Sequence, residues 1–108
     1  MITELVLLQL RKGITRDEVM ALYRQTAPAW AKNPDLLLKH YFFNEEQSVG
    51  GGVYVWTSKE AALRGHGEEY RTRVRELYGS EPRISHIDTL IVVDNVLKQV
   101  SEPPPSDK

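Results

Sequence analysis

The sequence contains no cysteine among its 108 residues. This absence excludes disulfide bridges, zinc sites built on thiolates and a cysteine nucleophile, and it fits a reducing compartment. An excess of charge is also lacking, because 14 Lys and Arg stand against 15 Asp and Glu, for a formal net charge of -1. Such a balance provides no basic surface for nucleic acid, so we expect no nucleic-acid partner.

Long apolar runs are lacking as well. The apolar N-terminal segment, Ile2 to Leu10, has no basic residues before it and is interrupted by Glu4, which argues against a signal peptide. No stretch of the sequence approaches the length of a membrane span. We therefore expect a cytoplasmic protein with no membrane partner.

Motifs that bind metals or phosphates are missing. The three histidines, His40, His66 and His86, show no metal-ligand spacing and no HExxH motif, so we predict no metal site. The glycines at 50–52 precede an apolar strand, whereas the glycines of a dinucleotide loop follow a strand and open a helix. We expect them to permit a bulge or the close approach of a neighbouring element; the alternative is that they leave space for a ligand.

The residues that are present are typical of one globular domain. Hydrophobic residues make up 41% of the chain and charged residues 27%, which is an ordinary composition for a domain of this length. We place the domain at residues 1–100. The segment 101–108 is polar and has three consecutive prolines (SEPPPSDK), and we expect it to be a disordered tail.

Hydrophobic periodicity predicts four strands and two helices. The strands are at 2–10, 36–44, 49–56 and about 83–95, and the helices are at about 15–33 and 57–78. Both helices begin with a capping-box spacing, at Thr15 and at Thr57, and Pro28 predicts a kink or break late in the first. The order β-α-β-β-α-β predicts an α+β, ferredoxin-like domain whose antiparallel four-stranded sheet carries both helices on one face.

The first and last predicted strands carry consecutive apolar residues, LVLL at 5–8 and LIVV at 90–93. A sheet with one solvated face alternates apolar and polar residues, whereas a sheet that is buried on both faces does not. Two helices can cover only one face. We therefore expect the other face to pack against the same sheet of a second copy, which makes the chain a homodimer.

Two segments of the chain carry a resemblance to a known family. They are LLLKHYFFNEEQSVGGGVYVWTSKEAA at 36–62 and ISHIDTLIVVDN at 84–95. With Lys39 on a strand, an acidic turn, a glycine-rich strand ending in an aromatic residue and a helix opening SKEAA, the chain resembles the mono-oxygenase family of the dimeric α+β barrel superfamily. That family is related to the antibiotic-biosynthesis monooxygenases. The superfamily also includes isomerases and haem-degrading enzymes, so its fold alone does not give the reaction.

The resemblance implies a dimeric α+β barrel and a cofactor-independent monooxygenase that oxidises a small aromatic substrate, quinol-like or polyphenol-like, with O₂. The haem-degrading relatives carry an Asn on strand one and a Trp and a His on helix two. Here strand one has no Asn, and Trp56 precedes helix two, so we expect no haem and no other cofactor. The substrate would supply the electrons, and the protein would supply a dry aromatic pocket and a group that accepts the phenol proton.

His66 is our candidate for the catalytic residue that accepts this proton. It lies on a helical stripe with Ala62, Tyr70, Val74 and Leu77 that should face the sheet, and glycines flank it on both sides. The alternative is a core histidine that bonds a backbone carbonyl or water.

The candidate pocket residues have rings that could stack on a flat substrate. They are Trp30, His40, Tyr54, Trp56 and Tyr70.

The alternation of side chains along strands assigns faces to other polar residues. His40 and Phe42 share one face of the strand at 36–44, whereas Lys39 and Tyr41 share the other. His86 shares a face of the last strand with the residue two positions on, Asp88. This pair could tune a base, but such pairs are also common at strand ends.

Two functions other than oxygenation stay open. One is a non-catalytic dimeric module that binds a small apolar or aromatic ligand or acts in stress. The other is an isomerase on the same fold, which needs a base but no oxygen. Oxygen consumption separates the monooxygenase from both alternatives.

Overall fold

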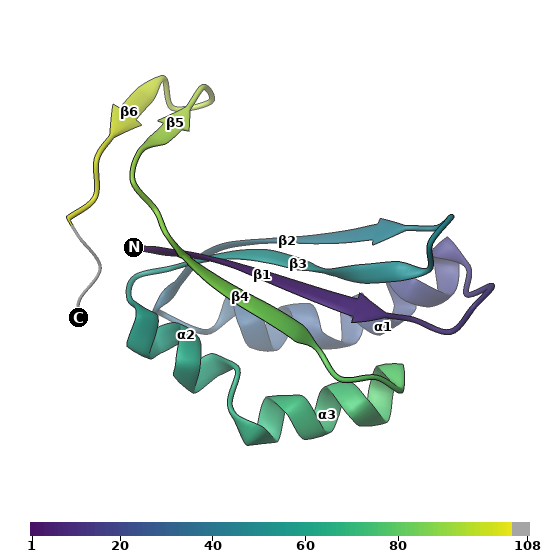
Figure 1. The fold of residues 1–108 in the computed structure, drawn as a ribbon. Coiled ribbons are helices and arrows are strands. Elements are labelled where there is room, and N and C mark those ends of the chain that lie inside the picture. Colours follow the sequence, from purple (N-terminus) through teal and green to yellow (C-terminus); the bar gives the residue numbers. More distant parts are fainter. Residues whose placement is uncertain (105–108) are drawn as a thin grey trace.

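Among the residues that the structure describes, a four-stranded sheet has three helices beneath one face and a small hairpin beyond one end (Figure 1). The computed structural model describes residues 1–104. The elements are β1 (Ile2–Gln9), α1 (Arg16–Ala31), β2 (Leu36–Asn44), β3 (Val49–Trp56), α2 (Lys59–Gly65), α3 (Glu68–Tyr78), β4 (Arg83–Asp88), β5 (Val92–Asp94) and β6 (Gln99–Ser101). The sheet order is β2-β3-β1-β4, antiparallel throughout. The α+β, ferredoxin-like prediction is confirmed. Among the described residues, no helix has the length and apolar character needed to cross a membrane.

The helix starts follow the capping chemistry of the sequence. Thr15 Oγ1 accepts a hydrogen bond from the Glu18 amide at 3.2 Å, and Glu18 Oε1 accepts one from the Thr15 amide at 2.9 Å, which completes the predicted capping box. The next helix begins one residue later than predicted, because Ser58 is its cap and accepts from the Ala61 amide. The predicted break at Pro28 is wrong, since α1 continues through it to Ala31. The proline removes one amide donor close to the end of the helix without ending it.

The single helix predicted at 57–78 is two helices. His66 ends α2 with φ -118° and ψ 42°, and Gly67 is the N-cap of α3. Gly65 packs directly on an indole ring, where an added Cβ would lie 2.5 Å from Cη2 of Trp56. Two glycines with low helix propensity therefore allow a tight contact with the sheet and a change of helix direction at one place.

The predicted last strand is also divided. β4 ends at Asp88, opposite Ile2 at the start of β1, and β5 pairs with β6 in a separate two-stranded sheet. This hairpin stands away from the main sheet (Figure 1). The apolar stretch at 90–93 is therefore not in the four-stranded sheet, which corrects the strand boundary predicted at 95. The predicted tail begins at the last residue of β6, and its residues 105–108 lie outside the described part of the chain.

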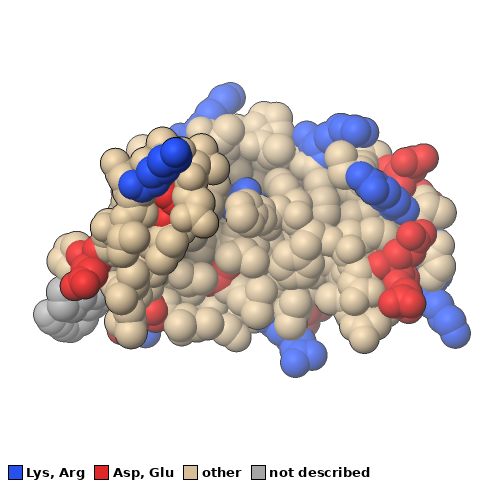
Figure 2. Space-filling view, turned by 90° about the horizontal axis from the view of Figure 1, so that it is seen from above, with Lys and Arg blue, Asp and Glu red and all other residues tan. Residues whose placement is uncertain are grey.

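The two faces of the main sheet differ in burial. The face toward the helices holds the core, with the buried residues Ile2, Glu4, Val6, Leu8, Tyr54 and Trp56. No helix of residues 1–104 lies over the other face (Figure 1), which carries the half-buried side chains of Leu5, Leu7, Val53 and Val55. Figure 2 looks onto this open face, whose middle is largely uncharged and whose charged residues lie mainly around the margin.

The glycines at 50–52 give α1 access to the sheet. The Tyr23 hydroxyl donates to the Phe42 carbonyl at 2.8 Å and accepts from the Gly51 amide at 2.9 Å. A Cβ at Gly50 would overlap this hydroxyl, and one at Gly51, where φ is +142°, would overlap the Val6 carbonyl oxygen. The predicted close approach of a neighbouring element is confirmed.

Candidate functional site

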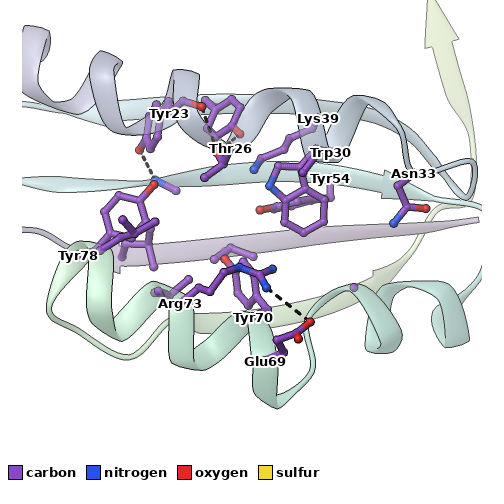
Figure 3. A pocket seen from close by; sticks show the side chains of 18 of the residues that line it. Tyr23, Thr26, Trp30, Asn33, Lys39, Tyr54, Glu69, Tyr70, Arg73 and Tyr78 are labelled. Carbon is purple, nitrogen blue, oxygen red and sulfur yellow. Dashed lines mark hydrogen bonds and ion pairs between the residues drawn. The ribbon is translucent and has the colours of Figure 1, made fainter.

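A cavity of about 660 Å³ lies between the helices and the sheet. Its walls come from α1 (Tyr23, Thr26, Trp30), α3 (Tyr70, Val74) and the sheet (Val6, Lys39, Tyr41, Tyr54). Figure 3 shows Trp30, Tyr54 and Lys39 grouped at one end and Tyr23 and Tyr78 at the other. At the margin, Glu69 and Arg73 form an ion pair at 3.5 Å. The size and the aromatic lining are typical of a site for a small organic molecule.

The central polar group of the cavity is the amine of Lys39. The side chain comes from β2 and crosses the face of β3, because Lys39 pairs with Tyr54 in the sheet register. Its Nζ lies 3.7 Å from the ring centroid of Tyr41, 4.5 Å from that of Tyr54 and 4.6 Å from that of Trp30. Within residues 1–104, no carboxylate lies within ion-pair distance of this amine.

Burial changes the protonation of this amine. Removal from water lowers the pKa of Lys39 to about 7, against a smaller opposing effect of the negative charge of Glu4. The three ring faces also favour the ammonium form. At neutral pH the cavity therefore holds both the free amine and the ammonium, so Lys39 is able to accept and return a proton.

The tyrosine hydroxyls around the cavity remain protonated. Burial raises the pKa of Tyr70 to about 12, and burial also raises the pKa of Tyr54 well above its ordinary value. The Tyr41 hydroxyl lies 2.5 Å from Oγ1 of Thr26, which itself donates to the Tyr23 carbonyl at 3.0 Å. Tyr41 is therefore the donor in its pair with Thr26, and this bond fixes the ring that lies under Lys39.

His66, the predicted catalytic residue, lies behind the cavity wall rather than on it. It is 5% exposed, stacks on Trp30 with centroids 5.3 Å apart, and meets Tyr54 and Tyr70 edge-on at 4.6 Å and 4.2 Å. Its Nδ1 lies 2.8 Å from Glu4 Oε1, but the two atoms do not have the geometry of a hydrogen bond. The change of direction between α2 and α3 turns this ring toward Glu4.

The other predicted pocket residues divide between the cavity and its surroundings. Trp30, Tyr54 and Tyr70 line the cavity, whereas Trp56 does not; its indole is fully buried and donates to Glu4 Oε1 at 2.7 Å. His40 is exposed and pairs with Val53 on the open face of the sheet, so its placement in the pocket is corrected. The alternation of side chains along the strand predicted that His40 and Lys39 lie on opposite faces of the sheet, and in the structure they do.

Glu4 is the centre of a second polar cluster, which the sequence did not reveal. Its side chain is completely buried, and its Oε2 lies 2.7 Å from His86 Nε2. With Trp56 and His66 on Oε1, this carboxylate joins β1, β3, β4 and the end of α2. The predicted partner of His86, Asp88, is exposed, and its side chain makes no hydrogen bond to His86 among the described contacts.

We predict that Glu4→Ala lowers the free energy of unfolding by about 3 kcal/mol or more, because it leaves the indole N–H of Trp56 and the imidazole of His86 without the buried carboxylate that they contact. Chemical denaturation followed by circular dichroism measures this loss. Glu76→Ala, on the exposed side of α3, is the control and should stay within about 0.5 kcal/mol of wild type. Equal losses in the two variants would contradict the structural role of Glu4.

Comparison with known proteins bears on the fold. No protein-family model and no curated protein matches the sequence. The crystal structure of an antibiotic biosynthesis monooxygenase matches with a TM-score of 0.64 and 18% identity, over 83% of this chain and 99% of that one. At this identity the likeness concerns the arrangement of the elements. The chain therefore has the ferredoxin-like α+β fold of an antibiotic biosynthesis monooxygenase, as the resemblance in its sequence predicted.

Proposed function

We propose that this protein is a monooxygenase that oxidises a small quinol-like or polyphenol-like molecule with O₂, without a cofactor. The observation that carries the proposal is the amine of Lys39, which lies among three aromatic rings in the cavity. The likeness to a structure described as an antibiotic biosynthesis monooxygenase supports the same class of reaction.

Binding would place the flat ring of the substrate against the aromatic end of the cavity. Trp30, Tyr54 and Tyr70 supply ring faces and edges there, and a substrate hydroxyl would approach Lys39 Nζ. Rings in offset or edge-to-face contact contribute about 1 kcal/mol each beyond the area that they bury. The protonated tyrosine hydroxyls would orient the remaining polar groups of the substrate.

Proton transfer from the phenol to Lys39 would be the step that activates the substrate. Transfer of a proton from a phenol with a pKa of ~10 to an amine with a pKa of about 7 costs about 4 kcal/mol of free energy. A phenolate and an ammonium about 4 Å apart attract each other by roughly 4 kcal/mol at the effective dielectric of a partly buried site. The contact ion pair is therefore accessible, and the ring faces stabilise its cationic half.

The phenolate would then supply the electrons to O₂. A ring carbon that carries a hydrogen atom forms a covalent bond to one atom of O₂, which gives a hydroperoxide. The O–O bond of this hydroperoxide then breaks as water leaves. One oxygen atom remains on the ring as a carbonyl and the other departs in the water, so a dihydroxyarene and O₂ yield a hydroxyquinone and water. Lys39 returns its proton to the departing oxygen.

Oxygen uptake tests this proposal. The purified protein is mixed with dihydroxybenzenes and dihydroxynaphthalenes in an oxygen-electrode cell, and the products are analysed after reaction under ¹⁸O₂. The proposal predicts uptake above the rate of autoxidation, with one labelled atom per product. Binding of these compounds without uptake would support the non-catalytic module, and their isomerisation without uptake would support the isomerase.

A homodimer through the open face of the sheet is also part of the proposal. The apolar side chains of Leu5, Leu7, Val53 and Val55 support it, as do six exposed apolar side chains at and beside the β5–β6 hairpin, Leu90, Ile91, Val93, Val96, Leu97 and Val100. Exposed apolar side chains that gather in one patch of a soluble protein often mark an interface. The uncharged centre of Figure 2 is consistent with contact between two identical faces.

We predict a particle of twice 12.4 kDa in light scattering at micromolar concentration. Leu5→Glu should give a folded monomer, because position 5 lies on the open face, whereas Val6→Glu should unfold the chain, because Val6 is 1% exposed beneath the helices. A wild-type mass of one chain would contradict the dimer.

A further inference from the structure

The amine of Lys39 differs from the other lysines that the structure describes. Lys12, Lys32, Lys59 and Lys98 are exposed, whereas Lys39 Nζ lies among ring faces and lines the cavity. The negative charge of Glu4 favours the ammonium form of Lys39. Both oxygens of Glu4, however, already contact other groups, which are the Trp56 indole and the imidazoles of His66 and His86. The amine is therefore held in an apolar site without a counterion of its own among residues 1–104.

A neutral amine in such a site is a nucleophile. Surface ammonium groups carry no free lone pair at neutral pH, because their pKa is near ~10.4. Desolvation in a hydrophobic pocket is a recognised way to activate lysine for attack on carbonyl carbon. Burial of Lys39, which brings its pKa to about 7, acts in this direction.

We propose that Lys39 forms a reversible imine with small aromatic aldehydes or ketones that enter the cavity. The Nζ lone pair attacks the carbonyl carbon, the C=O π electrons move to oxygen, and a proton passes from nitrogen to that oxygen. The C–O bond of this carbinolamine then breaks, water leaves, and the C=N bond forms. An amine and a carbonyl compound give an imine and one water, with no oxidant or reductant.

The cavity favours an aromatic group on the carbonyl compound. Trp30 and Tyr54 both lie close to the amine and contact each other edge to face, with centroids 5.3 Å apart. The protonated hydroxyls nearby, including that of Tyr70, are donors able to assist the loss of water. This activity goes beyond oxygenation, because it needs the cavity and the amine but neither O₂ nor a phenol.

Reductive trapping tests the imine. Wild-type protein is incubated at pH 7 with benzaldehyde and sodium cyanoborohydride, and the benzylated sites are found by intact mass and peptide mapping. We expect Lys39 to be labelled at least ~10-fold faster than any exposed lysine, given the difference in free amine. Mapping separates this adduct from one at the N-terminal amine. Labelling of Lys39 no faster than of Lys12 or Lys32, or none at Lys39, would overturn the proposal.

Two variants give the matched control. Lys39→Arg keeps the positive charge, removes the nucleophile and should lose the fast adduct, whereas Lys32→Arg, on the exposed end of α1, should keep it. Circular dichroism shows whether each variant is folded. If Lys39→Arg does not fold, the peptide map of the labelled wild type still shows whether Lys39 reacts faster than the exposed lysines. Benzaldehyde has no hydroxyl, and the trapping assay needs no O₂. A failure to trap an imine therefore does not decide whether the protein takes up oxygen, and a lack of oxygen uptake does not decide whether Lys39 forms an imine.

Discussion

Gly51→Ala is expected to abolish the native fold. The residue lies in β3, paired with Leu7 of β1, at φ +142°, in a region that is essentially restricted to glycine. An added Cβ would also overlap the Val6 carbonyl oxygen, which belongs to the same central pair of strands and cannot move without breaking their hydrogen bonds. Strain and overlap together cost more than about 4 kcal/mol, which is close to the whole stability of a small domain.

Gly79→Ala provides the control for this experiment. Gly79 also has a positive φ, +79°, but an added Cβ there would have open space around it. It should cost only about 1 to 2 kcal/mol. Thermal unfolding followed by circular dichroism should show a cooperative transition for Gly79→Ala and none for Gly51→Ala. A folded Gly51→Ala with a wild-type midpoint would contradict the described contact between β1 and β3.

Lys39→Met is expected to lower oxygen turnover by roughly a hundredfold or more, the usual effect of losing a general base. Methionine keeps the unbranched apolar stem, so the packing against Trp30, Tyr41 and Tyr54 should survive. The oxygen electrode measures the rate with the best substrate of the panel. Lys32→Met, at an exposed position, should leave the rate unchanged.

The protonation of Lys39 predicts the direction in which activity changes with pH. The base must be unprotonated, so kcat/KM of the wild type should rise with pH through about 7, the pKa of Lys39, and flatten above it. The residual activity of Lys39→Met should lack this rise. If His66 were the base instead, His66→Ala would lose turnover while Lys39→Met retained it, with the rise intact.

The order of the first four elements and the start of the first helix could be predicted because local chemistry determines them. Thr15 and Glu18 form their capping box from side chains three positions apart, and the glycine segment allows the predicted close approach of a neighbouring element, with Gly50 next to the Tyr23 hydroxyl. The stripe that contains His66 and Tyr70 is buried as predicted, except at its last position, where Leu77 is exposed. These features depend on residues that are close in sequence or on simple periodicity.

The site could not be predicted to the same depth, because it depends on contacts between distant residues. Strand alternation placed Lys39 on the face opposite His40, but it did not show which of the two faces the helices cover. Lysines on strands usually reach solvent, and only the folding of α1 over β2 encloses this one. Glu4 interrupts an apolar run, and its partners, His66 and His86, are 62 and 82 positions away by residue number. The division of the second helix, which turns His66 to Glu4, likewise depends on packing against Trp56.

The central claim, that Lys39 ionises a phenol bound in the cavity, is tested most directly by the absorbance spectrum of bound 4-nitrocatechol, a phenol that resists oxidation. The titration is done on the acid side of the probe's own pKa, where the free probe is neutral. We predict that binding to the wild type produces the phenolate band and that binding to Lys39→Met does not, because the ammonium of Lys39 stabilises the anion. A bound probe that stays neutral, or a phenolate band that is equally strong in Lys39→Met, would contradict the account.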